Sequence, residues 1–164
     1  MLNNSFDLMG QLFLHKLDPS SIYEEIASRR GTNKTIKRCE EFTIQNTILD
    51  NTTSRFKALN ATRRAAKSTT EVMSHVELCM KYPKSRTVYM GLTLDSITEI
   101  AWDVFKEINE ANNLGLKFNS TKRIIYYPNG SRTRLFGLDA SERQLAKILG
   151  QKLRKVSIDE AGSI

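Results

Sequence analysis

The sequence predicts an α/β fold in which helices pack around a mainly parallel sheet. Short apolar runs typical of strands alternate along the chain with longer segments of helical periodicity. Residues 87–92 are almost continuously apolar or aromatic, as expected of a parallel strand that is covered on both faces. Residues 94–113 give the clearest helix, with one apolar stripe formed by Leu94, Ile97, Ile100, Ala101, Val104, Phe105, Ile108 and Ala111.

Length and composition fit one globular domain. The chain has 164 residues, of which 40% are apolar, and no apolar run approaches the length of a membrane span. The N-terminus lacks the pattern of a signal peptide, and Cys39 and Cys79 match no metal or redox spacing, so we expect thiols in a reducing cytoplasm. The net charge of +7 is concentrated in residues 61–92 and 121–164, which is compatible with a surface that binds phosphate or DNA.

The first elements expected along the chain are helices. Residues 1–40 are interpreted as an N-terminal extension that contains a short amphipathic helix after Asp18. Residues 42–50 form a second predicted helix. Residues 56–59 (Phe-Lys-Ala-Leu) are predicted to form a short buried strand, which enters a loop over residues 60–66.

The loop leads into a helix that opens at Lys67 and ends before Pro83. His75 lies off the apolar face of this helix, so it is predicted to be exposed. The buried face is predicted from Val72, Val76, Cys79 and Met80, which recur at helical spacing.

The last third of the chain predicts a hairpin, a helix and a strand. Residues 122–137 are expected to form the hairpin, because Pro-Asn-Gly at 128–130 marks a turn. Residues 141–144 (Ser-Glu-Arg-Gln) match a capping box that opens a helix, and Gly150 is expected to end it. Residues 156–161 (Val-Ser-Ile-Asp-Glu-Ala) then read as a short strand that ends in two carboxylates.

A strand, a loop and then Lys-Ser at a helix start are the context of a phosphate-binding P-loop. The first amides of a helix lack internal partners, and the helix dipole favours an anion at this end. Lys67 adds a positive charge for the phosphates, and the Ser68 hydroxyl can act as a ligand for Mg²⁺. The general motif has glycine where this chain has Ala61 and Ala66. A Cβ disfavours positive φ and close approach to phosphate, so both alanines depart from the pattern.

The two carboxylates near the C-terminus fit a Walker B segment. In such a segment the aspartate, here Asp159, holds the hydrated Mg²⁺ ion, and the following glutamate, here Glu160, polarises a water molecule. A P-loop and a Walker B strand in this order, separated by alternating strands and helices, predict an ATPase that uses ATP and Mg²⁺.

Together these motifs resemble the large terminase subunits, the DNA-packaging motors of tailed bacteriophages. Residues 61–69 (Ala-Thr-Arg-Arg-Ala-Ala-Lys-Ser-Thr) look like the arginine-bearing Walker A variant of that family, and residues 149–161 look like its approach to Walker B. Gln45 stands where the family carries its adenine-contacting glutamine. The resemblance covers about residues 40–161.

The resemblance implies a P-loop NTPase sandwich of the additional-strand type over residues 41–164. It implies that Glu160 activates water, that Ser68 and Asp159 hold Mg²⁺, and that Gln45 contacts adenine. It also implies a nucleotide-binding loop made of Ala61, Thr62, Arg63, Arg64, Ala65, Ala66, Lys67, Ser68 and Thr69, in which Arg63 contacts the γ-phosphate. The implied partners are double-stranded DNA, a portal protein, a small terminase subunit and further copies of the complete protein in a ring, in the cytoplasm of an infected bacterium.

In that family the ATPase domain continues past Walker B with further strands, one of which lies between the Walker A and Walker B strands, and a nuclease domain follows. This sequence ends three residues after Ala161 and contains no second acidic cluster. We therefore expect a fragment that is truncated after the Walker B strand and lacks the nuclease domain. Two alternatives stay open: another helicase-like P-loop ATPase, and an inactive remnant that binds nucleotide or DNA.

Overall fold

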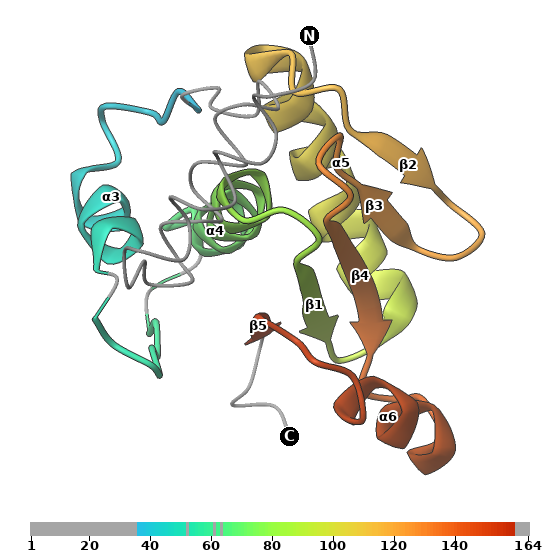
Figure 1. Cartoon of the computed structure of the whole chain (residues 1–164). Helices are drawn as coiled ribbons and strands as arrows, with labels where there is room; N and C mark the ends of the chain where they lie inside the picture. The colour runs from blue at the N-terminus through green and yellow to red at the C-terminus, as the bar shows by residue number, and fades with distance from the viewer. Residues whose placement is uncertain (1–35, 52, 61, 63, 160–164) are drawn as a thin grey trace, which may run out of the picture.

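The computed structural model describes residues 36–51, 53–60, 62 and 64–159 (Figure 1). Its helices and strands alternate over most of this range, as the sequence predicts. The elements in chain order are α3 (Thr43–Asp50), α4 (Lys67–Lys81), β1 (Arg86–Gly91), α5 (Leu94–Asn112), β2 (Lys117–Asn119), β3 (Ile124–Tyr126), β4 (Arg132–Gly137), α6 (Glu142–Leu149) and β5 (Lys155–Ile158). No helix in the part of the chain that the structure describes combines the length and the apolar character that a membrane span requires.

The five strands form one mixed sheet in the order β2-β3-β4-β1-β5. β1 lies between β4 and β5 and runs parallel to both, whereas β3 is antiparallel to β2 and β4. The described sheet is therefore half parallel and half antiparallel, and not mainly parallel as the sequence predicts, because the hairpin strands add antiparallel pairs at one edge. The register aligns Tyr89 of β1 with Leu135 of β4 and Ser157 of β5. Because side chains alternate along a strand, these three residues lie on the same face of the sheet.

Helices cover both faces of the sheet. α4 and α5 pack on one face through a core that includes Val72, Val76, Tyr89, Phe105 and Leu135. On the other face, Val88, Met90 and Phe136 pack against Ile148 of α6. Figure 1 shows α5 alongside β1 and β4, and α6 beyond the end of β4. The helical spacing of the apolar residues in α5 and the continuous apolar run of β1 agree with the burial of both elements in these layers.

An ion-pair cluster joins the segment before α4 to the helix itself. The Arg38 guanidinium donates to both carboxylate oxygens of Glu77, at 2.5 and 2.8 Å, and to Asp50 at 2.6 Å. These carboxylates raise the pKa of Arg38, the bond to Glu77 having the largest effect. Figure 1 shows α3 beside α4, away from the strands.

The predicted strand at residues 56–59 is wrong. These residues form no strand, and the Phe56 side chain is 84% exposed. A strand is stable only when a neighbour pairs its backbone groups, and the described residues supply none beside this segment. β5 is likewise paired on one side only, to β1, within the described sheet, and its Val156 and Ile158 side chains are 44% and 47% exposed.

Two further details differ from the sequence-based expectations. β2 was not predicted, because its three residues are too few to show a period-two pattern. Ser141 precedes α6, but among the described residues no side chain caps its first amides, so the expected capping box does not form. The Ser141 backbone carbonyl instead accepts from the Gln144 amide at 2.8 Å, which closes the first turn.

Candidate functional site

The loop before α4 and the end of β5 meet at the carboxyl edge of the parallel strands. The Asp159 amide donates to the Met90 carbonyl at 2.8 Å, so Asp159 continues the pairing of β5 with β1. Ser68, the second residue of α4, donates its hydroxyl proton to Asp159 Oδ2 at 3.1 Å. Ligands of α/β folds bind at this edge, where the strands end and helices begin.

The residue before α4 adopts an unusual backbone conformation. Ala66 is the N-cap residue with φ 53° and ψ 30°, in the left-handed region, and Arg64 has φ 63°. Among the described residues no side chain caps the helix, and its first turn holds no acidic residue. The first amides of α4 therefore present donors at the positive end of the helix dipole, where an anion is stabilised.

Two long side chains lie against the same loop. The Lys67 ammonium donates to the Thr62 carbonyl at 3.3 Å. The Gln45 side chain, on α3, donates from Nε2 to the Ala65 carbonyl at 3.0 Å. The Gln45 contact joins α3 to the loop before α4.

The Asp159 carboxylate has a second hydroxyl donor that the sequence did not indicate. Tyr89 lies in the middle of β1 and its phenol donates to Asp159 Oδ2 at 2.9 Å. Burial raises the pKa of Tyr89, and the neighbouring Asp159 charge raises it further. The phenol is therefore protonated at neutral pH and acts as a donor. Its place in an apolar strand pattern suggests a core residue, which is why sequence reasoning missed it.

His75 is fully buried, so the prediction that it is exposed is wrong. Its ring stacks on Tyr89 with centroids 5.6 Å apart, and its Nε2 lies 3.0 Å from Ser157 Oγ. Burial, together with the nearby Lys155 charge, lowers the pKa of His75, which is accordingly neutral. His75 is three residues after Val72 and four before Cys79, a spacing that places it on the buried face of α4, so helix geometry indicates its burial although its polar side chain suggested exposure.

A polar network continues from His75 to the first turns of α4. Ser157 donates to Glu71 Oε2 at 2.7 Å, so its oxygen accepts the proton on His75 Nε2. Lys155 also bonds to this cluster, with its ammonium 3.2 Å from Glu71 Oε2, and burial lowers the pKa of Lys155. This network ties β5, and with it Asp159, to α4 behind the loop.

The donor set at this edge suits Mg²⁺. Ser68 and Asp159 offer a hydroxyl and a carboxylate oxygen 3.1 Å apart, and both are the hard oxygen ligands that this ion prefers. The described residues contain no group of three or more His, Cys, Asp or Glu that could hold a metal.

Several of the predicted site residues lie outside the described part of the chain, namely Ala61, Arg63 and Glu160. The structure gathers the others around the start of α4: Gln45, Thr62, Arg64, Ala65, Ala66, Lys67, Ser68, Thr69 and Asp159.

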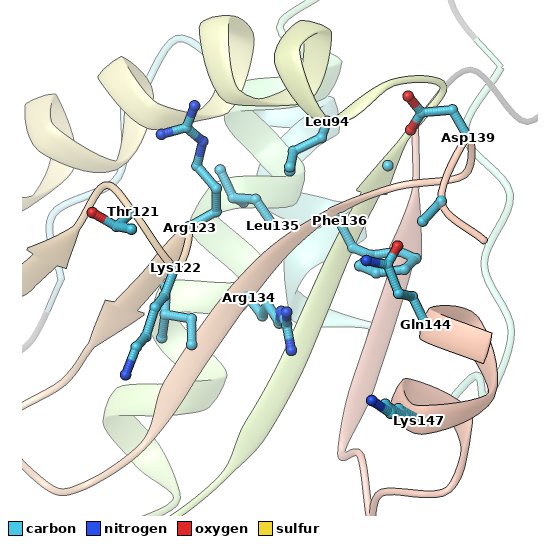
Figure 2. Close-up of a pocket in the computed structure, with 13 residues that line it drawn as sticks. Leu94, Thr121, Lys122, Arg123, Arg134, Leu135, Phe136, Asp139, Gln144 and Lys147 are labelled. Atoms are coloured by element: carbon cyan, nitrogen blue, oxygen red, sulfur yellow. The ribbon is translucent and has the colours of Figure 1, made fainter. Parts of the chain in front are cut away.

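A separate concave surface lies on the other side of β4, between the β3–β4 hairpin and α6 (Figure 2). This groove has a volume of about 700 Å³, and Phe136 and Ile124 are among its apolar lining residues. Its polar lining is mostly cationic, from Lys122, Arg123, Arg134 and Lys147, with Asp139 at one end. Figure 2 shows Arg134 on the sheet between Lys122 and Lys147. We refer to this surface as the cationic groove.

Comparison with solved structures shows a known fold. The chain is similar to the large terminase from a thermophilic bacteriophage in one crystal form, with a TM-score of 0.57 and 18% identity over 72% of this chain. The same protein in complex with ADP gives a TM-score of 0.57 at 17% identity over the same share. The chain spans only about a third of that protein, 32% and 31% respectively. No family model and no curated protein match this sequence. The predicted resemblance to large terminases is confirmed at the level of the fold.

Proposed function

We propose that this chain is the N-terminal part of a viral DNA-packaging ATPase that binds ATP with Mg²⁺ and couples its hydrolysis to DNA movement. The main support is the contact between Ser68 and Asp159, which lie 91 positions apart and meet at the carboxyl edge of a fold similar to a phage large terminase. In this proposal residues 41–164 are a partial ATPase domain, and residues 1–40 precede it as an extension.

Each residue at the site has a distinct role in this proposal. The first amides of α4 and the Lys67 ammonium bind the phosphates, and Arg63 contacts the γ-phosphate. Ser68 and Asp159 hold Mg²⁺, which neutralises charge on the phosphates when it is bound. Gln45 offers its amide to the adenine edge.

Hydrolysis itself needs an attacking water molecule and a group that orients it. In this proposal Glu160, which follows Asp159 directly in the sequence, polarises that water. The complete protein would act on double-stranded DNA as a ring, together with portal and small-subunit partners, in the cytoplasm of an infected bacterium.

Calorimetric titration with a non-hydrolysed ATP analogue, with and without Mg²⁺, tests the nucleotide site. Lys67→Ala is expected to abolish binding, since the substitution removes the phosphate-binding charge. Asp159→Asn is expected to remove only the Mg²⁺-dependent part of the affinity. Lys106→Ala is the matched control, because Lys106 lies on α5 and pairs with Asp103. Equal affinities for the Lys67→Ala and Lys106→Ala proteins would rule out the proposed site.

Turnover separates an ATPase from a binding remnant. Glu160→Gln should keep the affinity of the parent protein and lose phosphate release, because the carboxylate acts on the water and not on the bound nucleotide. A parent protein that binds the analogue but releases no phosphate from ATP would favour the remnant.

The cationic groove supports a second function, binding to the DNA backbone. Its basic side chains come from β4, the hairpin and α6, and Arg134 and Lys147 are exposed. Such a surface attracts DNA phosphates without regard to base sequence. This function does not require an intact nucleotide site.

Salt-dependent binding to a labelled duplex tests the groove. The double variant Arg134→Gln, Lys147→Gln should bind more weakly, with a slope of log affinity against log salt that is shallower by roughly 2 if both side chains contact phosphates. Lys37→Gln with Lys106→Gln removes the same charge from other exposed positions and is the control. The same slope for both double variants would show that DNA does not use the groove.

A further inference from the structure

Tyr89 combines complete burial with a hydroxyl that reaches the candidate site. The residue is 0% exposed and sits on β1, between β4 and β5. Its phenol contacts Asp159 Oδ2 at 2.9 Å, and the same oxygen accepts the Ser68 proton at 3.1 Å. Two hydrogen bonds to one carboxylate oxygen restrict rotation of the Asp159 side chain and so fix the orientation of the carboxylate.

The tyrosine ring is itself held in place from behind. His75 stacks on it at 5.6 Å with an interplanar angle of 29°, and the His75 ring is anchored to Ser157 at 3.0 Å. Ser157 in turn bonds to Glu71 of α4. Asp159 lies two residues after Ser157, and its amide still pairs with β1. The network therefore fixes the positions of the Tyr89 phenol and the Asp159 carboxylate relative to α4.

We propose that Tyr89 is a positioning residue that orients the Asp159 carboxylate toward a divalent cation. The inference rests on the proposed function only in taking Asp159 as a metal ligand. Groups that hydrogen-bond to metal ligands restrict the ligand geometry, and their loss typically weakens metal binding about 10- to 100-fold. The phenol is such a group, supplied by the neighbouring strand.

Tyr89→Phe removes the hydroxyl and keeps the stacked ring. The matched control is Tyr127→Phe, because the Tyr127 phenol is also buried and bonds to Thr133 Oγ1 at 2.9 Å, within the core and not at the site. Both substitutions lose one buried hydroxyl, so urea unfolding should report a similar loss of stability. Only Tyr89→Phe is expected to weaken binding of Mn²⁺, which uses the same oxygen ligands as Mg²⁺.

Mn²⁺ binding is measured by water proton relaxation, first with the metal alone and then with a non-hydrolysed ATP analogue. We expect Tyr89→Phe to weaken Mn²⁺ affinity about tenfold or more, with Tyr127→Phe close to the parent protein. His75→Phe, a second variant, leaves the phenol in place but removes the anchor behind it, and should weaken affinity less than Tyr89→Phe. If Tyr89→Phe does not unfold cooperatively, an effect of His75→Phe on Mn²⁺ decides the inference.

The outcomes separate this inference from the proposed function. Unchanged Mn²⁺ affinity in the Tyr89→Phe protein, or equal losses in the two Tyr→Phe proteins, would overturn the positioning role. A parent protein that binds no Mn²⁺ under either condition would overturn it too. A parent protein that binds Mn²⁺ but no nucleotide would reject the proposed ATPase, while the metal-alone comparison still decides the role of Tyr89.

Discussion

Replacing Ala66 by glycine is expected to relieve backbone strain at the start of α4. Ala66 has φ 53° and ψ 30°, where the Cβ of an L-residue is crowded and glycine is not. Ala65, its neighbour, is not among the described residues with positive φ. Ala65→Gly is therefore a matched control that makes the same chemical change without strain to relieve.

The magnitude follows from two opposing contributions. Glycine raises the entropy of the unfolded chain, which lowers the free energy of unfolding by about 0.4–1 kcal/mol in either variant. In Ala66→Gly, relief of the left-handed conformation adds roughly 1–2 kcal/mol. Because the unfolded-chain contribution is common to both, the Ala66→Gly protein should be more stable than the Ala65→Gly protein by about 1–2 kcal/mol.

Urea unfolding of the parent and the two variants measures this difference. For a denaturant slope of about 1–3 kcal/mol per molar urea, the two glycine variants should differ in midpoint by roughly 0.3–2 M. Coincident midpoints for the Ala65→Gly and Ala66→Gly proteins would refute the reasoning, because residue 66 would then carry no strain in the folded protein.

Two further predictions concern stability. Acid should destabilise the protein through His75, because burial lowers the pKa of His75 in the folded state. Below about pH 6.5 the unfolded state therefore binds one more proton than the folded state, and the free energy of unfolding decreases as the pH is lowered. Urea unfolding at about pH 7 and pH 5 should show a loss of up to about 1.4 kcal/mol per pH unit that His75→Gln lacks. Gly137→Ala should cost about 1–3 kcal/mol by thermal or urea unfolding, because the added Cβ would collide with the Leu94 backbone nitrogen and the Asp139 carboxylate. Gly150→Ala is its control, since a Cβ there only approaches the Ala146 carbonyl at 3.4 Å, and equal losses would contradict the steric argument.

The sequence by itself determined the elements whose pattern is long or strong. The helix predicted from residue 94 to 113 is α5, and the apolar run at 87–92 is β1 to within a residue. Periodicity of this kind reflects which side chains face the core, and it needs no knowledge of distant contacts. The order of the motifs also predicts that Ser68 and Asp159 belong to one site. Ser68 is placed at the start of a helix and Asp159 at the end of a strand, and in α/β folds these ends meet at the same edge of the sheet.

Tertiary structure alone decided the features that depend on a partner. Residues 56–59 carry a strand-like pattern, yet they form no strand because no described strand lies beside them to pair their backbone groups. His75 is spaced with the buried residues Val72 and Cys79, but only the tertiary structure supplies Ser157 of β5 as a hydrogen-bond partner for its buried Nε2. Tyr89 reaches Asp159, 70 positions away, only because β1 and β5 pair in a register that places Tyr89 beside Ser157. No tight turn joins β1 to β5, so their register depends on how both strands pack in the sheet and not on a local turn.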